Sequence, residues 1–230
     1  MPYYGQRKRV YRGRRHYRRR YVKKVPQQTG YLSTASKALT LASRVASMVN
    51  AEKFHIDSNY SSALTTSAVF TPLQLIAEGD DTAQRQGRSV KLAGLLMNFQ
   101  LQSDGAATNT NVARVMVIID WWSNGAVPVS SDLLVSNAVT SFRAVDNVNA
   151  KRFKVIYDRK FPMNIPSAGG IVRRNIEKYF NVHHHLKFLG STGVQATTGS
   201  GQMYLVVLAD NVTINAVTIN ANFRSYYYDN

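Results

Sequence analysis

The strongest constraint on the fold is an alternation of apolar and polar residues that begins near residue 52. In Leu95–Gln102, positions 95, 97, 99 and 101 are apolar, whereas positions 98, 100 and 102 are polar. A period of two places the apolar side chains on one face of a β-strand, and a helix would scatter them around its axis. The segment therefore predicts a strand with one face in a core.

Several other segments also predict strands. Val112–Trp122 is almost continuously apolar, as a central strand requires, and the turn signal Asn124-Gly125 follows it. Further strands are expected at 153–157, 180–188, 202–209 and 214–224. Seven or eight strands with little helix after residue 50 predict an all-β sandwich or barrel. Long loops are expected at 57–67, 103–111, 123–150 and 189–201.

The first 30 residues have a different character and predict a separate basic arm. No acidic residue precedes Glu52, and the arm contains eleven cationic side chains: Arg7, Lys8, Arg9, Arg12, Arg14, Arg15, Arg18, Arg19, Arg20, Lys23 and Lys24. The whole chain has 29 Lys and Arg against 13 Asp and Glu, so 18 basic residues remain outside the arm, a net charge of only +5 there. Self-repulsion keeps such an arm out of a core. We therefore expect a disordered arm, 1–30, and one β-domain, 31–230.

The arm has the chemistry of a nucleic-acid ligand. Arginine makes bidentate contacts to phosphate, and tyrosine rings stack on unpaired bases. The interleaved tyrosines are Tyr3, Tyr4, Tyr11, Tyr17 and Tyr21. This mixture predicts binding to single-stranded nucleic acid with little sequence readout. The alternatives are a solvated tail and a nuclear import signal, and an import signal can use the same residues.

The segment LSTASKALTLASRVASMVN, residues 32–50, has helical periodicity. Leu32, Ala35 and Leu39 begin an apolar stripe, and serines and threonines fall opposite. A short helix is therefore expected near 33–50. It either packs on its own domain or lies between the arm and a partner subunit.

The residues give little support for an enzyme. The chain has no cysteine, which excludes disulfides, a thiol nucleophile and cysteine-based zinc sites. G-x-S-x-G, H-E-x-x-H and P-loop motifs are absent, so neither catalysis nor a cofactor is expected. No signal peptide or apolar run of about 18 residues is present, so a cytosolic or nuclear location is expected.

Three consecutive histidines are the candidate metal ligands. In a strand, His183 and His185 share one face, and His184 points into the apolar row. Because no cysteine or nearby carboxylate completes a site, ordinary strand histidines are favoured over metal binding.

Basic residues also recur in the β-domain. They either extend the anionic path of the arm or form ordinary solvated faces, and Arg152 and Lys154 are expected to face solvent. The C-terminal Tyr226–Tyr228 fits an interface anchor or the domain's own core equally well. The basic clusters are Arg85/Arg88/Lys91, Lys151/Arg152/Lys154, Arg159/Lys160 and Arg173/Arg174.

The order of these features resembles the coat proteins of circular, Rep-encoding single-stranded DNA viruses (circovirus-like). The residues that carry the resemblance are the opening Met-Pro-Tyr with its arginine cluster, the stretch FTPLQLIAEGDDTAQRQGRSVKLAGLLMNFQL, and RFKVIYDRKF after Trp121-Trp122. The resemblance implies a single eight-stranded jelly roll in an icosahedral shell of sixty copies (T=1). The arm would face inward on single-stranded DNA.

The same resemblance implies a location in the virion, and in the host nucleus during assembly with help from the host import machinery. It identifies no receptor. The alternative is a cellular nucleic-acid-binding β-barrel, ribosomal or chaperone-like, with a basic extension. A basic membrane-binding protein is a third class.

Overall fold

The computed structural model describes residues 37–42, 53–103, 111–144, 149–163, 170–210 and 217–229. The chain divides into two units, residues 1–46 and 47–230. In the first unit, residues 37–42 are helical, with Leu39 and Leu41 exposed. The rest of the helix expected near 33–50, and the whole arm, lie outside the described residues.

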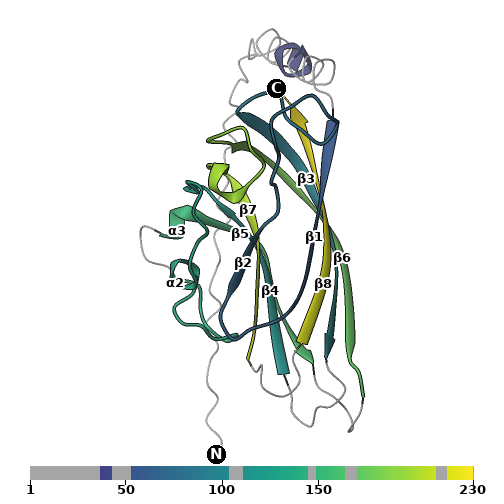
Figure 1. Ribbon diagram of the computed structural model, residues 1–230, viewed down its shortest axis with the longest axis vertical. Helices are drawn as coiled ribbons and strands as arrows, with labels where there is room; N and C mark the ends of the chain where they lie inside the picture. Colours follow the sequence, from purple (N-terminus) through teal and green to yellow (C-terminus); the bar gives the residue numbers. More distant parts are fainter. Residues whose placement is uncertain are drawn as a thin grey trace, which may run out of the picture. The chain divides into compact units, whose positions relative to one another are not determined.

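Eight strands in the described part of the second unit form two antiparallel sheets (Figure 1). Successive strands change sheet at every step except between β4 and β5, which pair with each other. This is the predicted eight-stranded jelly roll, so the expected fold class is confirmed. In order across each sheet, the strands are β1 (Lys53–Ala63), β8 (Val217–Asp229), β3 (Ser89–Ser103) and β6 (Arg173–Lys187), then β2 (Val69–Pro72), β7 (Gln202–Ala209), β4 (Asn111–Asp120) and β5 (Phe153–Met163).

The main core lies between the two sheets and is built from alternate residues of each strand. Met97 and Phe99 of β3 meet Val115 and Val117 of β4 in this apolar layer. Strand β4 also buries its other side, where Met116 belongs to a second apolar cluster. Because β4 and β7 are covered on both faces, their sequences are almost continuously apolar, as predicted for a central strand.

The second cluster is covered by the segment between β4 and β5. This segment contains the short helices α2 (Ser130–Leu133) and α3 (Asn149–Arg152), which lie beside the second sheet in Figure 1. Arg114 fixes the segment by donating to the carbonyls of Val139 and Ser141, at 3.3 and 2.7 Å. A 3₁₀ turn, η1 (Gln195–Thr197), lies between β6 and β7. In the described ranges, no helix has the length and apolarity needed to span a membrane.

The loop expected at 57–67 is wrong, because β1 occupies most of it. Lys53–Ala63 pairs with β8 along its whole length, from Lys53 opposite Tyr228 to Ala63 opposite Thr218. Only partly buried side chains such as Phe54 and Ile56 contribute from this edge strand to the core. An edge strand that buries so little apolar surface leaves a weak periodic signal in the sequence.

The C-terminal tyrosines divide between the two faces of β8. Tyr227 is fully buried and its ring lies 5.7 Å from that of Phe54. Tyr226 and Tyr228 lie partly exposed on the opposite face. The core interpretation therefore holds for Tyr227 alone.

Arg85 is a structural residue of the fold. Its side chain has no exposed surface, lies 4.1 Å from the centre of the Phe188 ring, and donates to the carbonyls of Ile76, Gly87 and Gly190. Burial lowers the pKa of its guanidinium. Of the predicted cluster Arg85/Arg88/Lys91, this member therefore cannot reach a ligand.

Replacement of Arg85 by methionine is expected to destabilise the domain by roughly 3 kcal/mol, because three carbonyls, at least one of them buried, would lose their donor. The matched control is Arg88→Met, an exposed site three residues away where a change within about 0.5 kcal/mol is expected. Urea unfolding followed by circular dichroism measures both. Equal stabilities for the two variants would contradict the structural role of Arg85.

Candidate nucleic-acid interface

The predicted arm residues between Arg7 and Lys24, both the cations and Tyr11, Tyr17 and Tyr21, lie outside the described residues. Their role in binding stays a prediction. The basic clusters of the β-domain, in contrast, can be placed on particular strands.

Arg152 is not solvent-facing, which corrects the expectation. It donates to both carboxylate oxygens of Asp120 at 3.0 Å and to Asp132 at 3.0 Å. The side chain of Asp120 has no exposed surface, and its hydrogen bond raises the pKa of Arg152. A buried carboxylate requires a paired cation, so Arg152 turns inward, and only Lys154 of the expected pair is exposed.

The exposed clusters converge on one edge of the sandwich. β5 and β6 are edge strands of different sheets, but the rings of Tyr157 and Phe180 lie 5.9 Å apart, and Lys178 Nζ lies 5.4 Å from the centre of the Tyr157 ring. The exposed cations of β5 and of the first half of β6 therefore lie along a shared edge, here named the basic edge: Lys154, Arg159, Lys160, Arg173, Arg174 and Lys178.

The acidic residues of the basic edge do not balance these cations. Asp158 accepts two hydrogen bonds of 2.8 Å from Arg114, which leaves Glu177 as the other carboxylate on the two strands. Charged side chains on edge strands oppose edge-to-edge pairing. Six cations against one free carboxylate are more than is needed to oppose strand pairing, and they fit contacts to phosphate.

The three histidines behave as strand residues. His184 is buried, its Nε2 lies 2.7 Å from the carbonyl oxygen of Gly201, and its ring lies 5.1 Å from that of Trp121. His183 and His185 are exposed, as the alternation predicts. Over the described ranges, no group of three or more metal-ligating side chains is found.

Burial, with the nearby charges of Lys154 and His185, lowers the pKa of His184 below its usual value near 6.5. Below pH 6.5 the unfolded chain therefore binds more protons than the folded chain, and stability falls as the pH drops. The expected loss for this group is at most about 1.4 kcal/mol per pH unit. The substitution His184→Gln should reduce the pH dependence of the unfolding free energy between pH 7 and pH 5. The substitution of the exposed His185 by glutamine should leave that pH dependence unchanged. Parallel pH profiles for wild type and His184→Gln would contradict this role.

The basic edge is expected to contribute to the salt dependence of nucleic-acid binding. Each phosphate contact to a single strand contributes about 0.7 to the slope of log K against log salt concentration. Replacing Arg159, Lys160, Arg173 and Arg174 with glutamine should therefore reduce the slope by up to about 3. Arg88→Gln, near the other end of β6, is the control. An unchanged salt slope in the fourfold variant would show that the basic edge does not contact the nucleic acid.

Sequence comparisons identify viral relatives. The family model for satellite tobacco necrosis virus coat protein matches residues 25–229. The coat protein of Satellite tobacco necrosis virus 2 is 24% identical over 84% of the chain and 92% of its own length. The coat protein of Maize white line mosaic Satellite virus is 31% identical over 41% of the chain, and the match spans 43% of that relative.

The solved structures found by comparison resemble the chain only weakly. A structure of the infectious bursal disease virus Gx strain is 8% identical over 78% of the chain and 32% of its own length, with a TM-score of 0.24. A Gt strain structure of the same virus gives 8% identity over 78% of the chain and 37% of its own length, with a TM-score of 0.22.

The comparisons confirm a viral coat protein and correct the more specific resemblance. Assignment to circular single-stranded DNA virus coats is wrong, because a basic arm on one β-domain reflects coat function and does not separate coat families. A coat protein is also a structural protein, consistent with the absence of catalytic motifs. The chain belongs to the satellite tobacco necrosis virus coat protein family.

Proposed function

We propose that this coat protein assembles into a small icosahedral shell, most simply of sixty copies, and binds encapsidated single-stranded nucleic acid through its basic arm. The observation that carries the proposal is charge segregation. Eleven cations and no carboxylate lie within residues 1–25, whereas the β-domain has a continuous apolar core of its own. A segment that concentrates cations without carboxylates is suited to binding a polyanion.

Exposed apolar side chains on the segment between β4 and β5 support assembly. Phe142 is 85% exposed and Val135 is 71% exposed, and Trp122, Val127 and Val129 are exposed on the same segment. Exposed apolar surface of this extent is typical of protein interfaces. A second copy of the chain is the partner that fits a coat protein.

Charge matching gives an expected genome size. Sixty copies of the eleven arm cations supply about 660 charges, and six more per subunit from the basic edge supply about 360. At one phosphate for each cation, the total neutralises on the order of 1,000 nucleotides. The cations of the protein can therefore neutralise the phosphates of a single strand of about this length without other counterions.

The preference for DNA is not carried forward, since it rested on the resemblance to DNA-virus coats. Arginine–phosphate pairs and tyrosine–base stacking serve RNA and DNA equally. The nuclear stage of assembly was implied by the same resemblance and loses that support, and no finding supports the import signal that the arm residues suggested. The proposed location is the virion.

The test uses the full chain, purified after expression with its cellular nucleic acid. Uniform spherical particles are expected in electron micrographs, with nuclease-protected nucleic acid inside. After the particles are disrupted, digestion with RNase A or DNase I shows whether the nucleic acid is RNA or DNA. Gel electrophoresis then compares the length of the packaged strand with the expected value of about 1,000 nucleotides per particle. A monodisperse monomer at all salt concentrations would contradict the proposed assembly.

A further inference from the structure

The outer face of the first sheet presents three tyrosines that the core does not use. Tyr179 of β6 is 49% exposed, and Tyr226 and Tyr228 of β8 are partly exposed on the same face. In register, Tyr226 lies between His55 of β1 and Gly94 of β3. Large aromatic rings on a strand face normally pack against something, so this exposed group requires an explanation.

The rings form a continuous surface across the sheet. The ring centre of Tyr226 lies 6.2 Å from that of Tyr179 and 6.5 Å from that of His55. Lys53 Nζ lies 4.9 Å from the centre of the Tyr226 ring. Side chains from three strands thus build one aromatic platform with a cation at its border.

The backbone beneath the platform is irregular, and this irregularity makes room for the ring of Tyr179. The pairing of β3 shifts register between Leu92 and Gly94, and His183 on the facing strand has a φ of +46°. A Cβ atom at position 94 would collide with the Tyr179 hydroxyl, so glycine is needed for the ring to lie over β3. Bulges and left-handed residues of this kind occur often at functional sites.

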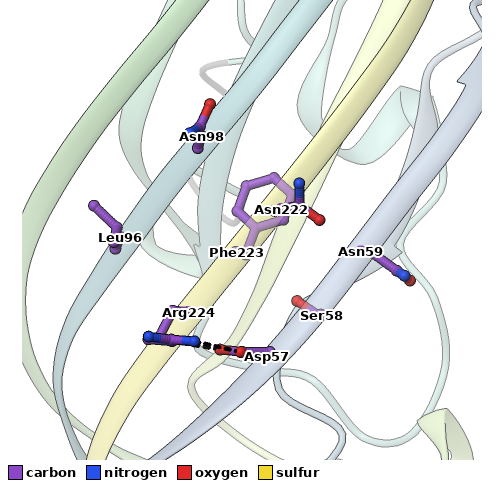
Figure 2. Close-up of a pocket in the computed structure, with 8 residues that line it drawn as sticks. All are labelled: Asp57, Ser58, Asn59, Leu96, Asn98, Asn222, Phe223 and Arg224. Carbon is purple, nitrogen blue, oxygen red and sulfur yellow. Dashed lines mark hydrogen bonds and ion pairs between the residues drawn. The ribbon is translucent and has the colours of Figure 1, made fainter.

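A polar hollow adjoins the platform on the same face (Figure 2). It measures about 480 Å³ and includes Asn59, Asn222 and Asn98, which lie side by side on β1, β8 and β3. Each amide offers both donors and acceptors, as the edges of nucleobases do. A volume of this size is in the range of small-ligand sites.

The charge around the platform favours an anion. Lys53 and Lys91 flank Tyr228 in one cross-strand row. Among the described residues, two of the nearby carboxylates are occupied, and Glu177, which lies opposite Asn98 on β6, is the free one. Asp57 accepts two hydrogen bonds of 2.7 Å from Arg224, and Asp229 accepts one of 2.6 Å from the backbone N–H of Gln86.

We propose that this face binds unpaired nucleotides of the packaged strand. Bases stack on Tyr179 and Tyr226, base edges meet the asparagine row, and Lys53 and Lys91 contact the adjoining phosphates. The inference rests on the proposed function, because it assigns a second contact surface to the same nucleic acid. The partner is a single strand, since a base paired within a duplex cannot reach a flat ring.

The test measures binding of a fluorescent oligouridylate and a fluorescent oligothymidylate to the full chain over a range of salt concentrations. Replacing both Tyr179 and Tyr226 with alanine should weaken binding on the order of tenfold for each ring removed. The salt slope should stay unchanged, because stacking releases no counterions. The matched control, Tyr179→Phe with Tyr226→Phe, retains both rings and should bind like wild type.

A second readout is ultraviolet crosslinking in assembled particles, with crosslinked nucleotides expected on the peptides that contain Tyr179 and Tyr226. Wild-type affinity in the double alanine variant, with unfolding unchanged, would overturn the inference while leaving the arm's function intact. Loss of assembly with normal oligonucleotide binding would also overturn it, and would assign the face to a second copy of the chain. Absence of nucleic-acid binding in the wild type would instead refute the proposed function.

Discussion

Apolar packing between the two sheets is the interaction on which the rest of the structure depends. It fixes which face of each strand turns inward, so alternate side chains point to the other face of their sheet, which on β4 and β7 is covered by the second apolar cluster. The residues named in this core all belong to the second unit. The proposed function divides the work accordingly: the β-domain forms the shell, and the cationic arm binds the nucleic acid.

Arginine has two distinct tasks in this protein. Arg85, Arg114 and Arg152 each use the planar guanidinium to join loops to the sandwich through carbonyls or carboxylates. Arg159 and Arg174 instead extend from the edge strands β5 and β6 toward solvent. A count of basic residues therefore overstates the surface available to nucleic acid, and the partners of each guanidinium decide its role.

The fold class could be predicted from the sequence because burial on one face or on both leaves different patterns. The run ending at Trp122 marked β4 as central, whereas the polar and weakly buried β1 was mistaken for a loop. Arg85 and Arg88 look alike in the sequence, since only tertiary packing makes one of them internal. The aromatic platform arises from strand pairing between distant segments, and the basic edge from contacts between the two sheets; no local pattern specifies either.

Folding and nucleic-acid packaging are expected to reside in separable parts of the chain. A chain lacking residues 1–25 tests this most directly, through its free energy of unfolding in urea and its content of nuclease-protected nucleic acid. The account predicts an unfolding free energy within about 0.5 kcal/mol of the full chain, together with loss of the protected nucleic acid. A truncated chain that fails to fold, or that retains the full nucleic-acid content, would contradict it.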